Sequence, residues 1–151
     1  MTTPFTRRTF LKRALATLAV GLLSPIVNAA WPKNAFQQKT LDDAIREALG
    51  TENITETSDL VIKAPDIAEN GAVVPVTVKA DRPDIETIAI LATGNNQPLV
   101  GTFALGTGAI ADVSVRIKMA KTSDIVAVAK IGDQLYRNSK NVKVTIGGCG
   151  G

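Results

Sequence analysis

Residues 112–119 read DVSVRIKM, and polar and apolar side chains alternate through the whole stretch. Successive side chains of an extended strand point to opposite faces, so this period of two predicts a β-strand. Its apolar positions are expected to be buried: Val113, Val115, Ile117 and Met119. Its polar positions are expected to face water: Asp112, Ser114, Arg116 and Lys118.

Further runs on both sides of this stretch also have the composition of strands. They are residues 59–63, 72–79, 85–92, 99–105, 124–131 and 142–146. Turn-forming clusters such as Asn70-Gly71 and residues 94–98 (GNNQP) separate them. Seven strands at this spacing predict a mainly β protein, an immunoglobulin-like antiparallel β-sandwich. Pro75 lies inside one strand and has no N–H to donate, so that strand is expected at an edge or a bulge.

One short helix is expected before the strands. Thr40 offers a hydroxyl cap, Asp43 follows three residues later, and Gly50 ends the segment. Apolar side chains recur between them at helical spacing, at Leu41, Ile45, Ala48 and Leu49. The segment predicts a helix of about two to three turns.

A docking surface is one of two interpretations of the expected strand 85–92. Ile88, Ile90 and Ala92 share one of its faces, and this face would suit a second subunit if it were exposed. Alternatively, both faces of the strand are buried inside the sandwich.

Composition narrows the class of protein. A chain of 151 residues has room for one domain. Its net charge of +3 includes four basic residues at the start, Arg7, Arg8, Lys12 and Arg13. Without them, 13 basic residues face 14 acidic ones, so the rest of the chain has no excess charge to attract nucleic acid or a membrane surface.

The chain contains no histidine, which excludes Ser–His–Asp and Cys–His mechanisms within it. Its single cysteine cannot form a thiolate zinc site, and its carboxylates do not follow the spacing of a calcium loop. We therefore expect no metal and no cofactor.

The N-terminus has the parts of a cleavable export signal. Residues 6–13 are basic (TRRTFLKR), residues 14–23 are apolar (ALATLAVGLL), and residues 27–29 (VNA) form a small-residue cleavage site. The apolar run is shorter than the about 20 residues of a membrane span. It also forms no stripe, which argues against an amphipathic surface helix. We expect residues 1–29 to be removed after Ala29 or Ala30.

The basic head resembles a twin-arginine signal, which carries folded proteins into the bacterial periplasm. The pattern is formed by Arg7, Arg8, Phe10, Leu11 and Lys12. Export of a folded chain suggests that something is assembled before export. Since no cofactor site is evident, a partner subunit is expected.

Residues 147–151 read GGCGG and contain Cys149, flanked by Gly147, Gly148, Gly150 and Gly151. Glycine favours neither helix nor strand, so this segment is expected to be a flexible arm beyond a domain of residues 30–146. Cys149 could be incidental on a frayed tail, could form an intermolecular Cys149–Cys149 disulfide, or could be a covalent attachment point. The three residues from Ile146 to Cys149 span about 10 Å, enough for the sulfur to enter a cleft of another protein.

The tail, residues 64–78 (APDIAENGAVVPVTV), residues 115–130 (VRIKMAKTSDIVAVAK) and the twin-arginine leader together resemble the SoxY family. Its members are the sulfur-carrier subunits of the bacterial Sox thiosulfate-oxidation system. The resemblance covers essentially the whole chain, and the tail matches the family's GGCGG at every position.

The resemblance implies a carrier and not an enzyme. In this family, a c-type haem enzyme joins thiosulfate oxidatively to the thiol that corresponds to Cys149. A hydrolase with a dinuclear manganese site then releases sulfate and leaves a persulfide. In many organisms a molybdenum enzyme oxidises the remaining sulfane sulfur.

The resemblance also implies a heterodimer with a smaller SoxZ-like subunit that lacks its own leader. Two other hypotheses stay open at this point. The chain could be a non-catalytic periplasmic binding or adhesion module with an inert tail. It could also be a thiol oxidoreductase, although a resolving cysteine and a base are missing from the sequence.

Overall fold

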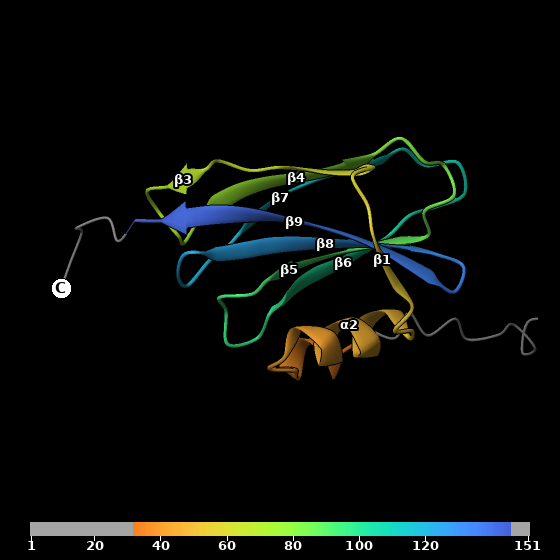
Figure 1. The fold of residues 1–151 in the computed structure, drawn as a ribbon, viewed down its shortest axis with the longest axis horizontal. Coiled ribbons are helices and arrows are strands. Elements are labelled where there is room, and N and C mark those ends of the chain that lie inside the picture. Colours follow the sequence, from red (N-terminus) through yellow and green to blue (C-terminus); the bar gives the residue numbers. More distant parts are fainter. Residues whose placement is uncertain (1–31, 146–151) are drawn as a thin grey trace, which may run out of the picture. The chain divides into compact units, whose positions relative to one another are not determined.

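The computed structural model describes residues 32–145, which form two packed β-sheets and one α-helix (Figure 1). A 3₁₀ turn, η1 (Ala35–Gln37), and the helix α2 (Leu41–Leu49) come first. The strands follow in the order β1 (Ile54–Glu56), β2 (Leu60–Lys63), β3 (Ile67–Ala68), β4 (Val74–Ala80), β5 (Thr87–Ala92), β6 (Leu99–Ala104), β7 (Ala111–Ile117), β8 (Ser123–Ile131) and β9 (Gln134–Val144). No helix among these residues is long and apolar enough to cross a membrane.

One sheet has the order β1-β9-β8-β5-β6, with β3 also paired to β9, and the other has the order β2-β4-β7. Most neighbouring strands are antiparallel, which confirms the predicted β-sandwich. The two short strands β1 and β3 are exceptions, because both pair with β9 in parallel.

The predicted helix is confirmed at both ends. The Thr40 hydroxyl accepts a hydrogen bond from the Asp43 backbone N–H at 3.2 Å, as an N-cap side chain does. Gly50 ends the helix with a φ of 76°, a left-handed conformation that glycine adopts without steric cost. Asp42 and Asp43 lie in the first turn, where the helix dipole favours negative charge.

The alternating stretch that predicted a strand lies in β7 as far as Ile117, and Lys118 and Met119 follow the strand. The apolar residues Ile117 and Met119 of this stretch are buried, and its polar residues are exposed. Val113 is buried as well, and Val115 is half-buried.

The core has two layers, one on each face of the larger sheet. Ile88, Ile90 and Ala92 of β5 are fully buried between the two sheets. On the other face, Ala89 and Leu91 pack in the layer that includes the apolar side of α2. The proposed docking surface on β5 is therefore wrong, because the second sheet covers one face of this strand and α2 covers the other.

The expectation that Pro75 marks an edge strand is also wrong. Pro75 belongs to β4, the central strand of its sheet. The sheet tolerates it because β2 pairs with β4 no further than Thr77, and Pro75 lies two residues beyond that point. Along its other side, β4 pairs with β7 at Arg116.

The last strand is longer than the sequence suggested. It begins at Gln134, whereas the pattern placed its start at residue 142. Polar residues in its middle interrupt the apolar pattern by which a strand is predicted. Two of them are satisfied across the sandwich: Asn138 Nδ2 donates to the Leu60 carbonyl at 2.8 Å, and Lys140 Nζ donates to the Ala64 carbonyl at 2.7 Å.

Candidate functional site

The predicted site residues lie outside the described part of the chain. Cys149 and the arm glycines Gly147, Gly148, Gly150 and Gly151 follow the last described residue, Thr145. The signal residues Arg7, Arg8, Phe10, Leu11 and Lys12 precede the first, Pro32. The structure does describe the surface from which the chain continues toward Cys149, at the end of β9.

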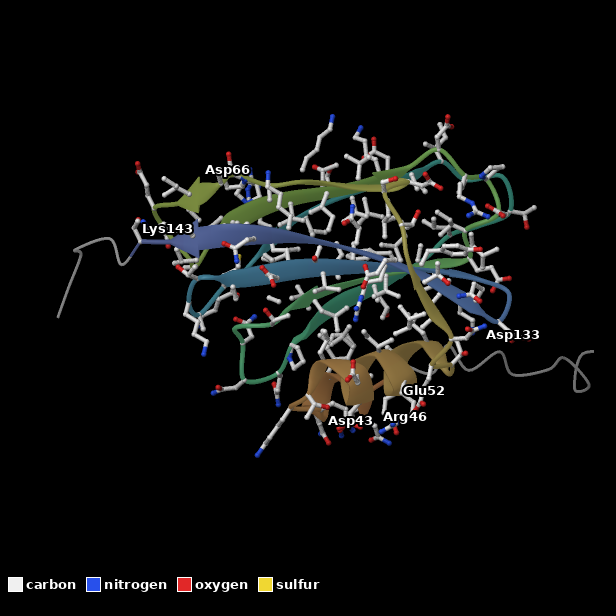
Figure 2. The ribbon with its side chains drawn as sticks, in the orientation of Figure 1. Asp43, Arg46, Glu52, Asp66, Asp133 and Lys143 are labelled. Carbon is white, nitrogen blue, oxygen red and sulfur yellow. The ribbon has the colours of Figure 1, made fainter. Side chains whose placement is uncertain are left out.

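A parallel strand holds one side of the β9 end. The two residues of β3 pair with Lys143 and Val144. The Lys143 N–H donates to the Asp66 carbonyl at 3.0 Å, and the Thr145 N–H donates to the Ala68 carbonyl at 3.0 Å. Figure 2 shows Asp66 and Lys143 close together at this end of the sandwich, far from Asp133, which directly precedes β9.

A single side chain holds the other side. The pairing of β8 with β9 stops at Ser123 and Val142, so β8 offers no backbone partner to Val144. The Thr122 hydroxyl replaces that partner. It accepts from the Val144 N–H at 2.9 Å and donates to the Val144 carbonyl at 3.3 Å, the same exchange that two paired strand residues would make.

The Asn70-Gly71 turn closes over this junction. The Asn70 side chain accepts from the Ala72 N–H at 2.9 Å, and the Gly71 carbonyl accepts from the Met119 N–H at 2.7 Å. A Cβ atom on Gly71 would lie 2.5 Å from the Met119 carbonyl oxygen and 2.8 Å from Cγ1 of Val144. The position therefore requires glycine because three segments approach each other closely, and not because of a positive φ.

Sequence reasoning missed this junction. The Asn70-Gly71 pair predicts only a tight turn, and Thr122 belongs to no motif in the sequence. No local pattern marks a threonine that bonds to a strand 22 residues away. The signal that could have found it is the stretch 64–78 of the family resemblance, which contains β3 and the turn.

Charged groups near the junction form one ion pair across it. Lys140 Nζ lies 3.1 Å from the Asp66 carboxylate and so ties the start of β3 to β9.

Two carboxyl groups have a lowered pKa in other parts of the fold. A hydrogen bond from Thr40 lowers the pKa of Asp43, and a hydrogen bond from Arg82 lowers the pKa of Asp84. Within residues 32–145, no group of three or more cysteine, aspartate or glutamate residues could hold a metal ion.

The fold and the sequence that follows it define a class of protein. It is an immunoglobulin-like β-sandwich whose last strand is held on both sides up to Thr145 and leads, four residues later, to a single glycine-flanked cysteine. Residues 45–149 match the family described as "Sulfur oxidation protein SoxY". The chain therefore belongs to the SoxY family.

A solved structure supports this assignment. The sulfur carrier protein SoxY from Chlorobium limicola f thiosulfatophilum is 45% identical, with a TM-score of 0.66. The similarity covers 71% of this chain and 97% of that one. No curated protein sequence matches the chain.

Two more distant structural similarities carry no argument. A chain in the structure on T cell specificity and activation by the bacterial superantigen toxic shock syndrome toxin-1 is 13% identical, with a TM-score of 0.40, over 57% of this chain and 99% of that one. An engineered protein is 15% identical, with a TM-score of 0.39, over 58% of this chain and 20% of that one.

Proposed function

We propose that this chain is a periplasmic sulfur carrier, that it holds thiosulfate-derived sulfur covalently on Cys149, and that it is not itself an enzyme. The observation that carries the proposal is the family match, which extends through the cysteine at residue 149. The 45% identity with a protein described as a sulfur carrier supports the same conclusion.

The position of the cysteine in the sequence suits this role. Thr145 is the last residue bonded to the domain among those described, and Cys149 follows four residues later. Four residues span at most about 13–14 Å, which is enough to bring a thiol into the cleft of another protein. Transfer between enzymes then needs no release of the sulfur intermediate.

The chemistry needs a single thiol. Loading joins the Cys149 thiolate to the sulfane sulfur of thiosulfate and forms an S–S bond, and the two electrons released pass to the haem enzyme. Hydrolysis of the S-thiosulfonate then consumes water, releases sulfate and two protons, and leaves a persulfide on Cys149. A second cysteine in the chain could attack the loaded sulfur, and the sequence has none.

The other partners follow from the family. We infer a heterodimer with a SoxZ-like subunit, and transient contacts with the haem, manganese and molybdenum enzymes of the Sox system. Export by the twin-arginine route would let a leaderless subunit cross the membrane together with this chain. A Cys149–Cys149 disulfide between two carriers is an expected side product.

Intact-mass spectrometry tests the proposal. The exported protein is incubated with thiosulfate and the thiosulfate-oxidising haem enzyme, and its mass is compared before and after. We expect an added thiosulfonate group that maps to Cys149 and is absent from Cys149→Ser. The thermal midpoint of the variant should equal that of the parent, because the core clusters consist of residues of the described domain.

An unmodified Cys149 would instead favour a binding module with an inert tail. Turnover of thiosulfate by the isolated chain would favour a thiol oxidoreductase. Either result would contradict the proposed carrier function.

A further inference from the structure

The backbone at the end of β9 is hydrogen-bonded beyond the point where its pairing with β8 stops. Beyond Val142, where the β8 ladder stops, the backbone N–H groups of Lys143, Val144 and Thr145 all have hydrogen-bond acceptors. These acceptors come alternately from the segment 66–68, which contains β3, and from Thr122. The last three described residues are thus held from both sides by segments that are distant in sequence.

We propose that β3, the Asn70-Gly71 turn and Thr122 form a clamp that positions the carrier arm. The clamp, defined here as residues 66–71 together with Thr122, fixes Thr145 as the point from which the arm extends. Its residues are positioning residues, because they act on Cys149 through the backbone of β9. This inference rests on the proposed carrier function and adds what sets the reach of the thiol.

The clamp changes the reach considerably. From Thr145 to Cys149 the chain has four residues, which span at most about 13–14 Å. If residues 143–145 were free, the tether would start at Val142 and contain seven residues, with a span of about 23–25 Å. A longer flexible tether dilutes its end group over a larger volume, so the thiol would meet a docked active site less often.

The clamp is itself anchored to the sandwich. Ala68 of β3 is buried in the core, and Asp66 pairs with Lys140 at 3.1 Å. The Gly71 carbonyl accepts from the Met119 N–H at 2.7 Å, and the backbone of Gly71 approaches Val144 too closely for a Cβ atom. The two-residue strand β3 is therefore fixed at both of its ends, and it can hold β9 in turn.

Two substitutions loosen the clamp, and the chain supplies a matched control for each. Thr122→Val removes the hydroxyl that bonds to Val144 and keeps the shape of the side chain. Its control is Thr93→Val, because the Thr93 hydroxyl makes the same pair of bonds with the Asp124 backbone, at 3.1 and 3.2 Å, but on the side of β8 that pairs with β5 and not at the end of β9. Thr122→Ser should restore the parent behaviour, because it retains the hydroxyl.

Gly71→Ala is the second clamp variant, because its Cβ would collide with the Met119 carbonyl. Gly106→Ala is its control, since a Cβ there meets no atom within 4 Å and the backbone does not have a positive φ. If Gly71→Ala does not fold, the surface variant Thr122→Val still decides the question.

The first measurement needs no Sox enzyme. A nitroxide on Cys149, the single cysteine, broadens the NMR signals of amides that it approaches. In Thr122→Val and Gly71→Ala we expect the broadening to reach amides farther from Thr145, and amide exchange at Val144 and Thr145 to rise about tenfold. The control variants and Thr122→Ser should match the parent. A parent-like profile in Thr122→Val overturns the proposal.

The second measurement connects the clamp to transfer. For sulfur loading by the haem enzyme, we expect KM for the clamp variants to rise about three- to tenfold while kcat stays within about twofold, because the chemistry at the thiol is unchanged. Unchanged KM in both clamp variants contradicts the role in positioning. If Cys149 of the parent protein is never loaded, the carrier function is rejected instead. The nitroxide measurement then still tests the clamp on its own.

Discussion

At the scale of single residues, two side chains of the same type can differ completely in how far they are buried. Ile90 and Ile110 are both isoleucines in the β region of the sequence. Ile90 is 0% exposed between the two sheets, whereas Ile110 is 85% exposed just before β7. The first contributes to the core, and the second removes little apolar surface from water.

This contrast predicts different stabilities for two equal substitutions. Ile90→Ala should lower the free energy of unfolding by about 2–5 kcal/mol, because it leaves a cavity in a packed core. Ile110→Ala should change it by less than about 0.5 kcal/mol. Urea unfolding followed by circular dichroism measures both. A similar loss in the two variants would contradict the burial that the structure assigns to them.

At the scale of elements, α2 depends on its N-terminal cap. The Thr40 hydroxyl accepts from the Asp43 N–H and donates to the Asp43 carboxylate at 2.5 Å. The same carboxylate forms an ion pair with Arg46. The hydrogen bond from Thr40, followed by the charge of Arg46, lowers the pKa of Asp43 below its ordinary value.

Thr40→Ala should therefore destabilise the protein by about 1 kcal/mol at pH 7. The folded-state pKa of Asp43 is below its unfolded value of about 3.9. The carboxylate thus stabilises the folded state above that pH, and the contribution disappears as pH falls through the folded-state pKa. The difference between Thr40→Ala and the parent should be smaller near pH 3 than at pH 7 in urea unfolding.

Thr40→Ser is the control for the cap, because serine retains the hydroxyl, and it should remain close to the parent at both pH values. An equal loss for Thr40→Ala at pH 3 and pH 7 would show that Asp43 is not coupled to the cap.

The elements that could be predicted are those whose signals are local. Thr40 and Gly50 predict the ends of the helix, and the strict alternation of polar and apolar residues predicts β7. The start of β9 was missed because Asn138 and Lys140 are polar, yet backbone carbonyls of β2 and of Ala64, directly after β2, accept their hydrogen bonds. The short strands β1 and β3 were missed because their structure comes from pairing with β9 and not from their own composition.

The candidate site divides in the same way. Cys149 could be predicted as a site residue from the sequence, because its chemistry and its glycine neighbours are adjacent along the chain. The clamp could not be identified, because Gly71, Thr122 and Val144 meet only after folding. Hydrogen bonds between distant backbones leave no periodic pattern in a sequence.

At the scale of the whole molecule, the expected export signal and the expected carrier cysteine lie near opposite ends of the sequence. The family match runs from Ile45 in α2 to Cys149, so it joins the core and the thiol in one unit. The expected leader, residues 1–29, precedes this unit in the sequence. We propose that the leader exports the chain only after the sandwich has folded and has bound its partner subunit.

This order of events makes a prediction about export. Replacing both Arg7 and Arg8 by lysine keeps the charge of the leader but removes the twin-arginine pattern. The precursor should then stay in the cytoplasm, and the leaderless partner should stay with it. The control is Arg13→Lys, which makes the same chemical change outside the pair and should be exported like the parent. Fractionation followed by immunoblotting of both subunits measures the outcome.

The result distinguishes export of a folded chain from export of an unfolded chain. A chain exported unfolded could not carry a second subunit through the membrane, so the partner would need a leader of its own. Normal export of the double lysine variant would therefore contradict both the twin-arginine route and assembly before export. Retention of this chain with normal export of its partner would contradict assembly alone, because a subunit bound to the folded sandwich cannot cross without it.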